Sequence, residues 1–218
     1  MSYQDALKYD KRKFCSYYCS LIRKKNYILF SFCPNRDYNS KIIKISLFFL
    51  FFSIYYFINA LFFDEPTIHN IYEEQGFYNF IYLVPHIFYS FTISQILNTI
   101  IKYIFLSERN ICKIKNEKKI QKIYDIIDKV KKCLVIKYIY FFCLGLIFLL
   151  FFWYYLSSFG AVYQNTQIYL IKNTIISFGV SLIYPFIINI IPSILRIYAL
   201  KRNNKECLYK ASKFIQYI

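Results

Sequence analysis

The stretch Lys44–Pro66, KISLFFLFFSIYYFINALFFDEP, decides the fold of this chain. After Lys44 it runs for nineteen residues, Ile45–Phe63, without a charged side chain, and then reaches Asp64 and Glu65. A helix that rises about 1.5 Å per residue crosses the roughly 30 Å hydrocarbon layer of a bilayer in about 20 residues. The stretch therefore has the length and the apolar character of one membrane-spanning helix.

Charge-free windows of this kind recur along the chain. The later ones are Gln75–Ile101, Tyr138–Ile171 and Asn173–Leu195. The window Tyr138–Ile171 is too long for one crossing, so we expect its helix to end near Gly160, with GAVYQNTQIYLIK forming a turn and the approach to the next span. The 218 residues are 57% hydrophobic and only 18% charged, against about 25% charged in average globular proteins. The sequence predicts an all-α integral membrane protein whose four spans form a helix bundle.

The basic residues are sorted along the chain, which tests this interpretation. Of the 28 Lys and Arg residues, 27 lie in three segments that four spans would place on one face of the membrane; these are residues 1–44, 102–137 and 196–218. The connection 64–76 carries four acidic residues and no basic one. Because basic flanks mark the cytosolic side, we expect both termini in the cytosol, in a plasma membrane or an endomembrane.

These segments give the expected domain organisation. It consists of a cytosolic juxtamembrane or interfacial segment at 1–44, a first transmembrane pair with a short acidic outer loop at 45–101, a basic cytosolic helical linker at 102–137, a second transmembrane pair at 138–195 and a basic cytosolic tail at 196–218. The net charge of +16 suits attraction to anionic lipids of the cytosolic leaflet. The aromatic residues concentrate in the spans rather than on a basic groove, so no nucleic acid partner is expected.

The seven cysteines agree with this topology. None lies on a predicted outer loop, where oxidation to disulfides would be expected. We expect reduced thiols, with acylation of Cys33 or Cys112 beside the membrane as the alternative.

Polar residues recur at steps of four within two of the predicted spans. They are His86, Ser90, Ser94 and Asn98 in one span and Ser177, Ser181, Pro185, Asn189 and Ser193 in the other. Each set lies on one helix face, and such a face should point to protein or water rather than to lipid. One interpretation is interhelical packing, and the other is a hydrated or ion-coordinating pathway between the two helices. Pro85, Pro185 and Pro192 should bend these spans.

The basic linker carries a second pattern. Apolar residues recur at alternating spacings of three and four at Ile120, Ile123, Ile127, Val130 and Leu134. This seam of about two heptads is too short for a stable free coiled coil. We expect it to be a docking seam for a partner helix, for the rest of the cytosolic part or for the membrane surface.

The sequence carries no pattern that indicates an enzyme. The four glycines are scattered, only two histidines occur, and the predicted spans contain no carboxylate for acid–base chemistry. We therefore expect no catalytic activity, no metal site and no cofactor.

Two stretches resemble a known membrane region. About residues 8–202 are similar to the C-terminal membrane region of large surface proteins of single-celled eukaryotes. The similarity rests on five short motifs in the same order, NALFF, IYEEQG, LSERNI, VYQNTQ and LIYPF. That region in turn resembles, distantly, the polycystin family's membrane segment ahead of its channel domain. The resemblance implies a non-catalytic module of a receptor- or channel-like protein, here a fragment or short paralogue. The chain has no room for the family's ectodomain or six-span channel, so no residue inherits ion conduction.

Three functions follow as hypotheses. The first is a non-enzymatic module that anchors or assembles a larger membrane complex, with other membrane subunits or a second copy as partner. The second is participation in cation conduction or its regulation, and the third is small-solute transport, which would favour inverted repeats that the two halves do not show.

Overall fold

A computed structural model describes residues 3–10, 12–34, 37–73, 80–106, 120–164, 166–201 and 205–217, with only the backbone described at residues 80, 82, 120–126 and 217. Every element in this part of the chain is a helix, which confirms the all-α class. Three helical stretches are long and apolar enough to cross a membrane, namely Lys41–Leu61, Ile127–Val162 and Gln167–Lys201.

The chain divides into two compact units. We call Met1–Asn35 together with Val180–Ile218 the terminal unit, and Arg36–Gly179 the central unit. Each unit has its own packing.

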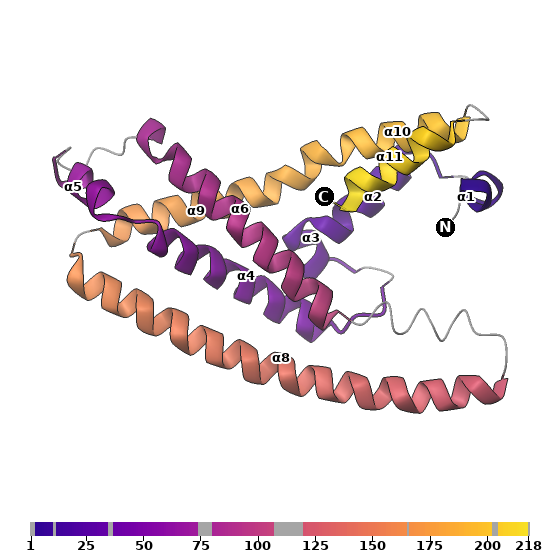
Figure 1. Ribbon diagram of the computed structural model, residues 1–218, viewed down its shortest axis with the longest axis horizontal. Helices are drawn as coiled ribbons and strands as arrows, with labels where there is room; N and C mark the ends of the chain where they lie inside the picture. The colour runs from indigo at the N-terminus through magenta and orange to yellow at the C-terminus, as the bar shows by residue number, and fades with distance from the viewer. Residues whose placement is uncertain are drawn as a thin grey trace. The chain divides into compact units, whose positions relative to one another are not determined.

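The central unit is built on one buried helix. Its helices are α4 (Lys41–Leu61), α5 (Glu65–Glu73), α6 (Phe80–Phe105), α8 (Ile120–Val162) and the first part of α9 (Gln167–Ile188). Helix α4 packs against both α6 and α8 (Figure 1). Its fully buried side chains include Leu47, Phe51 and Tyr55. Because α4 is covered on several sides, it forms the centre of this unit.

A small apolar cluster closes one end of the central unit. It joins the last turn of α4 to α5, to the last turns of α8 and to the start of α9, and its buried members are Ala60, Phe63, Ile68, Ile71, Leu156, Phe159 and Leu170. Helix α5 occupies the connection that the sequence predicted as a short acidic loop. Helix α4 ends at Leu61, and Pro66 lies in the first turn of α5, where a proline is tolerated because its missing N–H would have no partner there.

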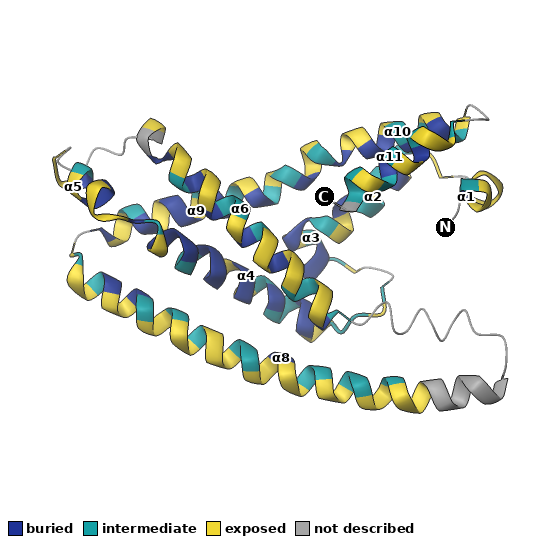
Figure 2. Cartoon of the chain, in the orientation of Figure 1, coloured by how far each residue is buried: buried dark blue, intermediate teal, exposed yellow. Residues whose placement is uncertain are grey.

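Helix α8 is much longer than one membrane crossing. Its 43 residues span about 65 Å at 1.5 Å per residue. The expected boundary between the linker and the second transmembrane pair, at residues 137 and 138, falls inside this continuous helix. The helix ends at Val162, two residues beyond the expected end at Gly160. Figure 2 shows exposed residues along most of its length.

The terminal unit joins the two ends of the chain. Its helices are α1 (Tyr3–Tyr9), α2 (Phe14–Lys25), α3 (Tyr27–Phe32), α10 (Ile190–Lys201) and α11 (Glu206–Tyr217), together with the last turns of α9. Helix α10 packs on α11 and on α2 (Figure 1). The buried residues of α10 are Pro192, Ser193, Arg196 and Ala199, which share one face.

The last predicted span is interrupted. Helix α9 ends at Ile188, and α10 begins at Ile190. Pro185 and Pro192 stand on either side of this break, and each lacks the N–H that would continue the helical hydrogen bonds. The sequence predicted a bend at these prolines, and the structure places the interruption between them, at Asn189.

Candidate functional site

The polar face of α6 is buried within the central unit. Ser90, Ser94 and Asn98 are each 0% exposed, and α6 packs mainly on α4. The hydroxyl groups of Ser90 and Ser94 have no hydrogen-bond partner among the described residues. Small side chains at a contact let two helices approach closely. The face is therefore a packing surface that also holds two unsatisfied hydroxyl groups.

His86, at the end of this face, belongs to a polar cluster that three elements build. Its ring atom Nδ1 lies 3.0 Å from the carbonyl oxygen of Phe62, which ends α4. Its other ring nitrogen, Nε2, lies 3.2 Å from Oγ1 of Thr67 in the first turn of α5. The Thr67 hydroxyl donates a short hydrogen bond to Oδ1 of Asp64, and the Thr67 backbone N–H donates to the same oxygen at 3.1 Å. We call Asp64, Thr67 and His86 the junction cluster.

The junction cluster combines a buried and an exposed member. Thr67 is 0% exposed, whereas Asp64 is exposed to solvent. The hydroxyl and backbone N–H of Thr67 stabilise the ionised carboxylate and hold the pKa of Asp64 below its ordinary value. The sequence singled out His86 alone, because nothing local indicates that residues 64 and 67 would fold back onto it.

The polar face predicted for the last span begins on α9, continues through Asn189 onto α10, and divides between the two units. All five of its members are buried. Ser177 belongs to the central unit, where its hydroxyl accepts a hydrogen bond of 2.8 Å from Nδ2 of Asn59 on α4. Ser177 thus accepts a hydrogen bond from α4 itself, and His86 contacts the carbonyl of Phe62, the residue that follows α4. Helix α4 therefore lies next to the polar residues of both α6 and α9 in the central unit.

The remaining members of the α9 face lie in the terminal unit, around the helix break. The amide Nδ2 of Asn189 donates to the carbonyl oxygen of Pro185 at 2.6 Å, and the hydroxyl of Ser193 donates to the carbonyl of Asn189 at 2.6 Å. Ser181 is fully buried beside them. These side chains serve the interrupted backbone, as polar residues next to a proline break commonly do in membrane helices.

Side chains from both ends of the chain also bind this interrupted segment. Asn26 donates to the carbonyl oxygen of Leu182 at 2.7 Å, and Tyr18 donates to that of Phe186 at 2.8 Å. Ser212 of α11 donates to the carbonyl of Pro192 at 2.8 Å. The segment before α4, which the sequence assigned only an interfacial role, is therefore bound to the last apolar helices.

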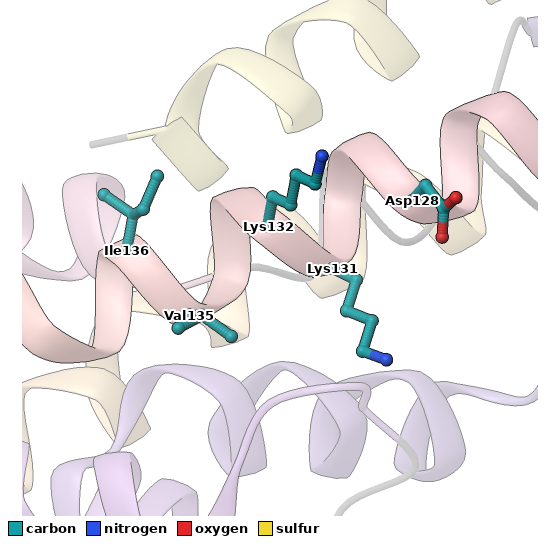
Figure 3. A pocket seen from close by; sticks show the side chains of 5 residues that line it. All are labelled: Asp128, Lys131, Lys132, Val135 and Ile136. Carbon is teal, nitrogen blue, oxygen red and sulfur yellow. The ribbon is translucent and has the colours of Figure 1, made fainter.

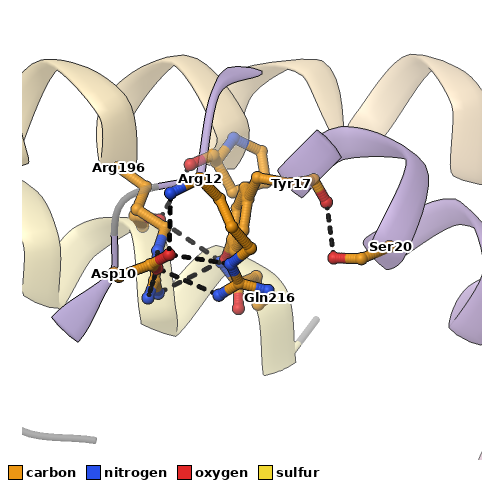
Figure 4. A network of polar contacts seen from close by, with 8 residues as sticks. Asp10, Arg12, Tyr17, Ser20, Arg196 and Gln216 are labelled. Carbon is orange, nitrogen blue, oxygen red and sulfur yellow. Dashed lines mark hydrogen bonds and ion pairs between the residues drawn. The ribbon is translucent and has the colours of Figure 1, made fainter. Parts of the chain in front are cut away.

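An ion-pair cluster that the sequence did not indicate lies at the centre of the terminal unit (Figure 4). Asp10 Oδ2 accepts hydrogen bonds from Arg196 Nη2 at 2.6 Å and from Arg196 Nε at 3.1 Å. Arg12 Nε donates to Oδ1 of the same carboxylate at 2.7 Å. The side chains of Asp10 and Arg196 are 3% and 7% exposed. Hydrogen bonds from Arg12, and then from Arg196, hold the pKa of Asp10 far below its ordinary value in spite of its burial.

Two tyrosine rings complete this cluster. The guanidinium of Arg196 lies 4.6 Å from the ring centroid of Tyr17 and 5.0 Å from that of Tyr209. The Tyr17 hydroxyl accepts a hydrogen bond from Gln216. The carboxylate and the faces of the two aromatic rings together compensate the buried charge of the Arg196 guanidinium. We call Asp10, Tyr17, Arg196 and Tyr209 the terminal clamp.

Helix α8 carries an open hollow beside the expected docking seam. Its lining residues are Asp128, Lys131, Lys132, Val135 and Ile136, and Figure 3 shows Lys131 and Lys132 projecting to opposite sides of the helix. Of the seam, Ile127 is exposed while Val130 and Leu134 are half-buried. The side chains of Ile120 and Ile123 lie outside the described part of the chain.

The chain matches no family model, no curated protein and no solved structure.

Proposed function

We propose that the chain is a four-span, non-enzymatic membrane protein with both termini in the cytosol, which anchors or assembles a larger receptor- or channel-like complex. The support comes from three features: the exposed apolar surface of α8, the burial of polar groups inside the helical units, and the sorting of basic residues along the chain.

The exposed surface of α8 carries the proposal. Only 6% of its most apolar stretch is buried by the rest of the chain, against 56% for α4. Its exposed residues include Leu146, Leu150 and Trp153. Apolar surface left in water costs roughly 25 cal/mol per Å². Lipid or a neighbouring subunit must therefore cover this helix. Because α8 is longer than one membrane crossing, part of it extends into the cytosol, and the docking seam lies on that extension.

Helix α6 supplies the fourth span of this proposal. It has 26 residues, about 39 Å at 1.5 Å per residue, although it is not among the three stretches that are long and apolar enough by composition to cross a membrane. Its polar face is buried, while Phe88, Ile96 and Tyr103 on its other faces are exposed. A bilayer favours this distribution, in which apolar side chains face outward from the helices and polar side chains lie between them.

A labelling experiment tests the topology. We expect a membrane-impermeant maleimide on intact cells to modify a cysteine introduced as Glu73→Cys but not the native Cys15, Cys19 or Cys207, which are all exposed in the structure. After permeabilisation all four should react. Modification of the native thiols in intact cells would refute the proposed orientation.

A photo-cross-linking experiment tests the assembly role. A benzoylphenylalanine at Leu146, which is 60% exposed, should form adducts with another protein subunit in the native membrane. The matched control is the same side chain at Phe141, which is 3% exposed and should cross-link only within the chain. Adducts with lipid alone at Leu146, Leu150 and Trp153 would refute assembly through α8.

One observation favours cation conduction as a second function. The buried hydroxyl groups of Ser90 and Ser94 lack partners in the described part of the chain, as groups that contact water or a passing ion would. Currents through the purified chain in liposomes that fall with Ser90→Ala and Ser94→Ala would support conduction. A tight seal with the chain fully inserted would refute it. No feature of the residues that the structure describes favours solute transport.

A further inference from the structure

The junction cluster has a hydrogen-bond pattern that depends on a proton. The carbonyl oxygen of Phe62 only accepts, so Nδ1 of His86, 3.0 Å away, must carry a hydrogen. The Thr67 hydroxyl has one hydrogen and donates it to Asp64. The contact of 3.2 Å between Thr67 Oγ1 and His86 Nε2 is then a hydrogen bond only if Nε2 also carries a hydrogen.

The same atoms allow a second arrangement. When Nε2 of His86 carries no hydrogen, it is an acceptor. The Thr67 hydroxyl can rotate and donate to Nε2, and Asp64 then keeps the hydrogen bond from the Thr67 backbone N–H. The two arrangements differ by one proton from water, which is added to Nε2, and by the rotation of one hydroxyl group. All other bonds in the cluster stay in place.

The described charged groups near the junction cluster lie on α5 and just before it. Helices α4 and α8 bring no charged side chain to this end, because Ile45–Phe63 and Tyr138–Val162 contain none. On α5, His69 and Glu73 pair with each other at 3.1 Å on the exposed surface. Asp64 is the acidic group that the described residues place against His86 through Thr67, and its exposure connects the cluster to water.

We propose that Asp64, Thr67 and His86 form a proton-binding site in which the Thr67 hydroxyl changes its acceptor from His86 to Asp64 when His86 gains a proton. An imidazole ordinarily changes charge between about pH 5 and about pH 8. The site joins the end of α4, the start of α5 and the body of α6, so protonation alters the bonding that fixes these three helices to one another. This proton site is independent of whether the chain assembles a complex or conducts ions.

The test uses the full chain in detergent micelles, labelled with ¹³C at the aspartate carboxyl groups and with ¹⁵N in the histidine rings. The Asp64 signal is assigned by its loss in Asp64→Asn, and the His86 signal by its loss in His86→Gln. During a pH titration the carboxyl signal of Asp64 should show a step at the pH where the ring of His86 gains its proton. Below that pH both ring nitrogens of His86 should carry hydrogen.

Three variants separate the hydroxyl switch from a direct charge effect. Thr67→Val removes the hydroxyl at nearly constant shape and should reduce the step at Asp64 by at least about threefold. Thr67→Ser keeps a hydroxyl and should retain the step, which also guards against misfolding of the valine variant. His69→Gln removes the only other histidine and should leave the step unchanged.

Three results would overturn the proposal. One is a His86 ring that keeps the same charge throughout the titration. Another is an Asp64 signal without a step at the pH where His86 titrates. The third is a step of equal size in Thr67→Val, which would mean that the two charges interact without the hydroxyl.

Discussion

Breaking the terminal clamp should open the terminal unit locally. The change Asp10→Asn removes the carboxylate that Arg196 contacts at 2.6 and 3.1 Å, and it leaves a guanidinium whose side chain is 7% exposed. Removing one partner of a buried ion pair costs about 3–5 kcal/mol, because the remaining charge is uncompensated. The two tyrosine rings retain part of the stabilisation, so we expect about 3 kcal/mol, which is about 150-fold in the opening equilibrium.

Native-state hydrogen exchange in detergent micelles measures this effect. Amides of α10 and α11 should exchange about 150-fold faster in Asp10→Asn, while amides of α4 in the central unit serve as the internal reference. Arg196→Met should act in the same direction, and the double variant should cost less than the sum of the two. Glu206→Gln is the matched control, because it breaks an exposed pair with Lys210 and should change nothing measurable. A change below about threefold in Asp10→Asn would refute the reasoning.

The clamp also has an expected dependence on pH. The pKa of Asp10 is lower in the folded chain than in the unfolded one, so its contribution to stability is complete above the unfolded value of about 3.9. It is lost as the pH falls through the folded pKa. Protection of α10 and α11 attributable to Asp10 should therefore stay constant from about pH 8 to about pH 5 and decline only in stronger acid. Arg12 bonds the same carboxylate, but its side chain is 45% exposed, so Arg12→Gln should cost less than Arg196→Met.

Three further predictions concern the central unit, each measured by denaturant unfolding in micelles. Asn59→Leu should lower the free energy of unfolding by about 0.6–1.7 kcal/mol through loss of the bond to Ser177, and Ser177→Ala should add little to it; full additivity would contradict a shared bond. Leu47→Ala, at a side chain 0% exposed, should cost about 2–5 kcal/mol, whereas the exposed Phe49→Ala should cost much less; equal costs would contradict the burial of α4. Gly145→Ala meets no atom within 4 Å and should stabilise α8 by about 0.5–1 kcal/mol, and a loss of stability would indicate a covered surface.

The sequence by itself determined the helical class and the apolar stretches that suit a membrane. Both follow from local properties: a charge-free run such as Ile45–Phe63 can satisfy its backbone in lipid only as a helix. An irregularity in the last span could also be expected locally, since Pro185 and Pro192 remove backbone donors on either side of the break at Asn189. The prediction that polar residues at steps of four share one helix face rests on the same local reasoning, because that spacing alone places residues on one face.

Only the tertiary structure decided which partners these residues meet. Asp10 and Arg196 are separated by 186 positions, and no local pattern identifies that carboxylate among the surrounding basic residues. Thr67 and Asp64 reach His86 because α5 folds back over the end of α4, a turn that the acidic composition of the connection does not specify. Helix α6 packs mainly on α4, and Asn59 of α4 bonds to Ser177 of α9, because close packing and the need to satisfy buried donors are settled among all helices together.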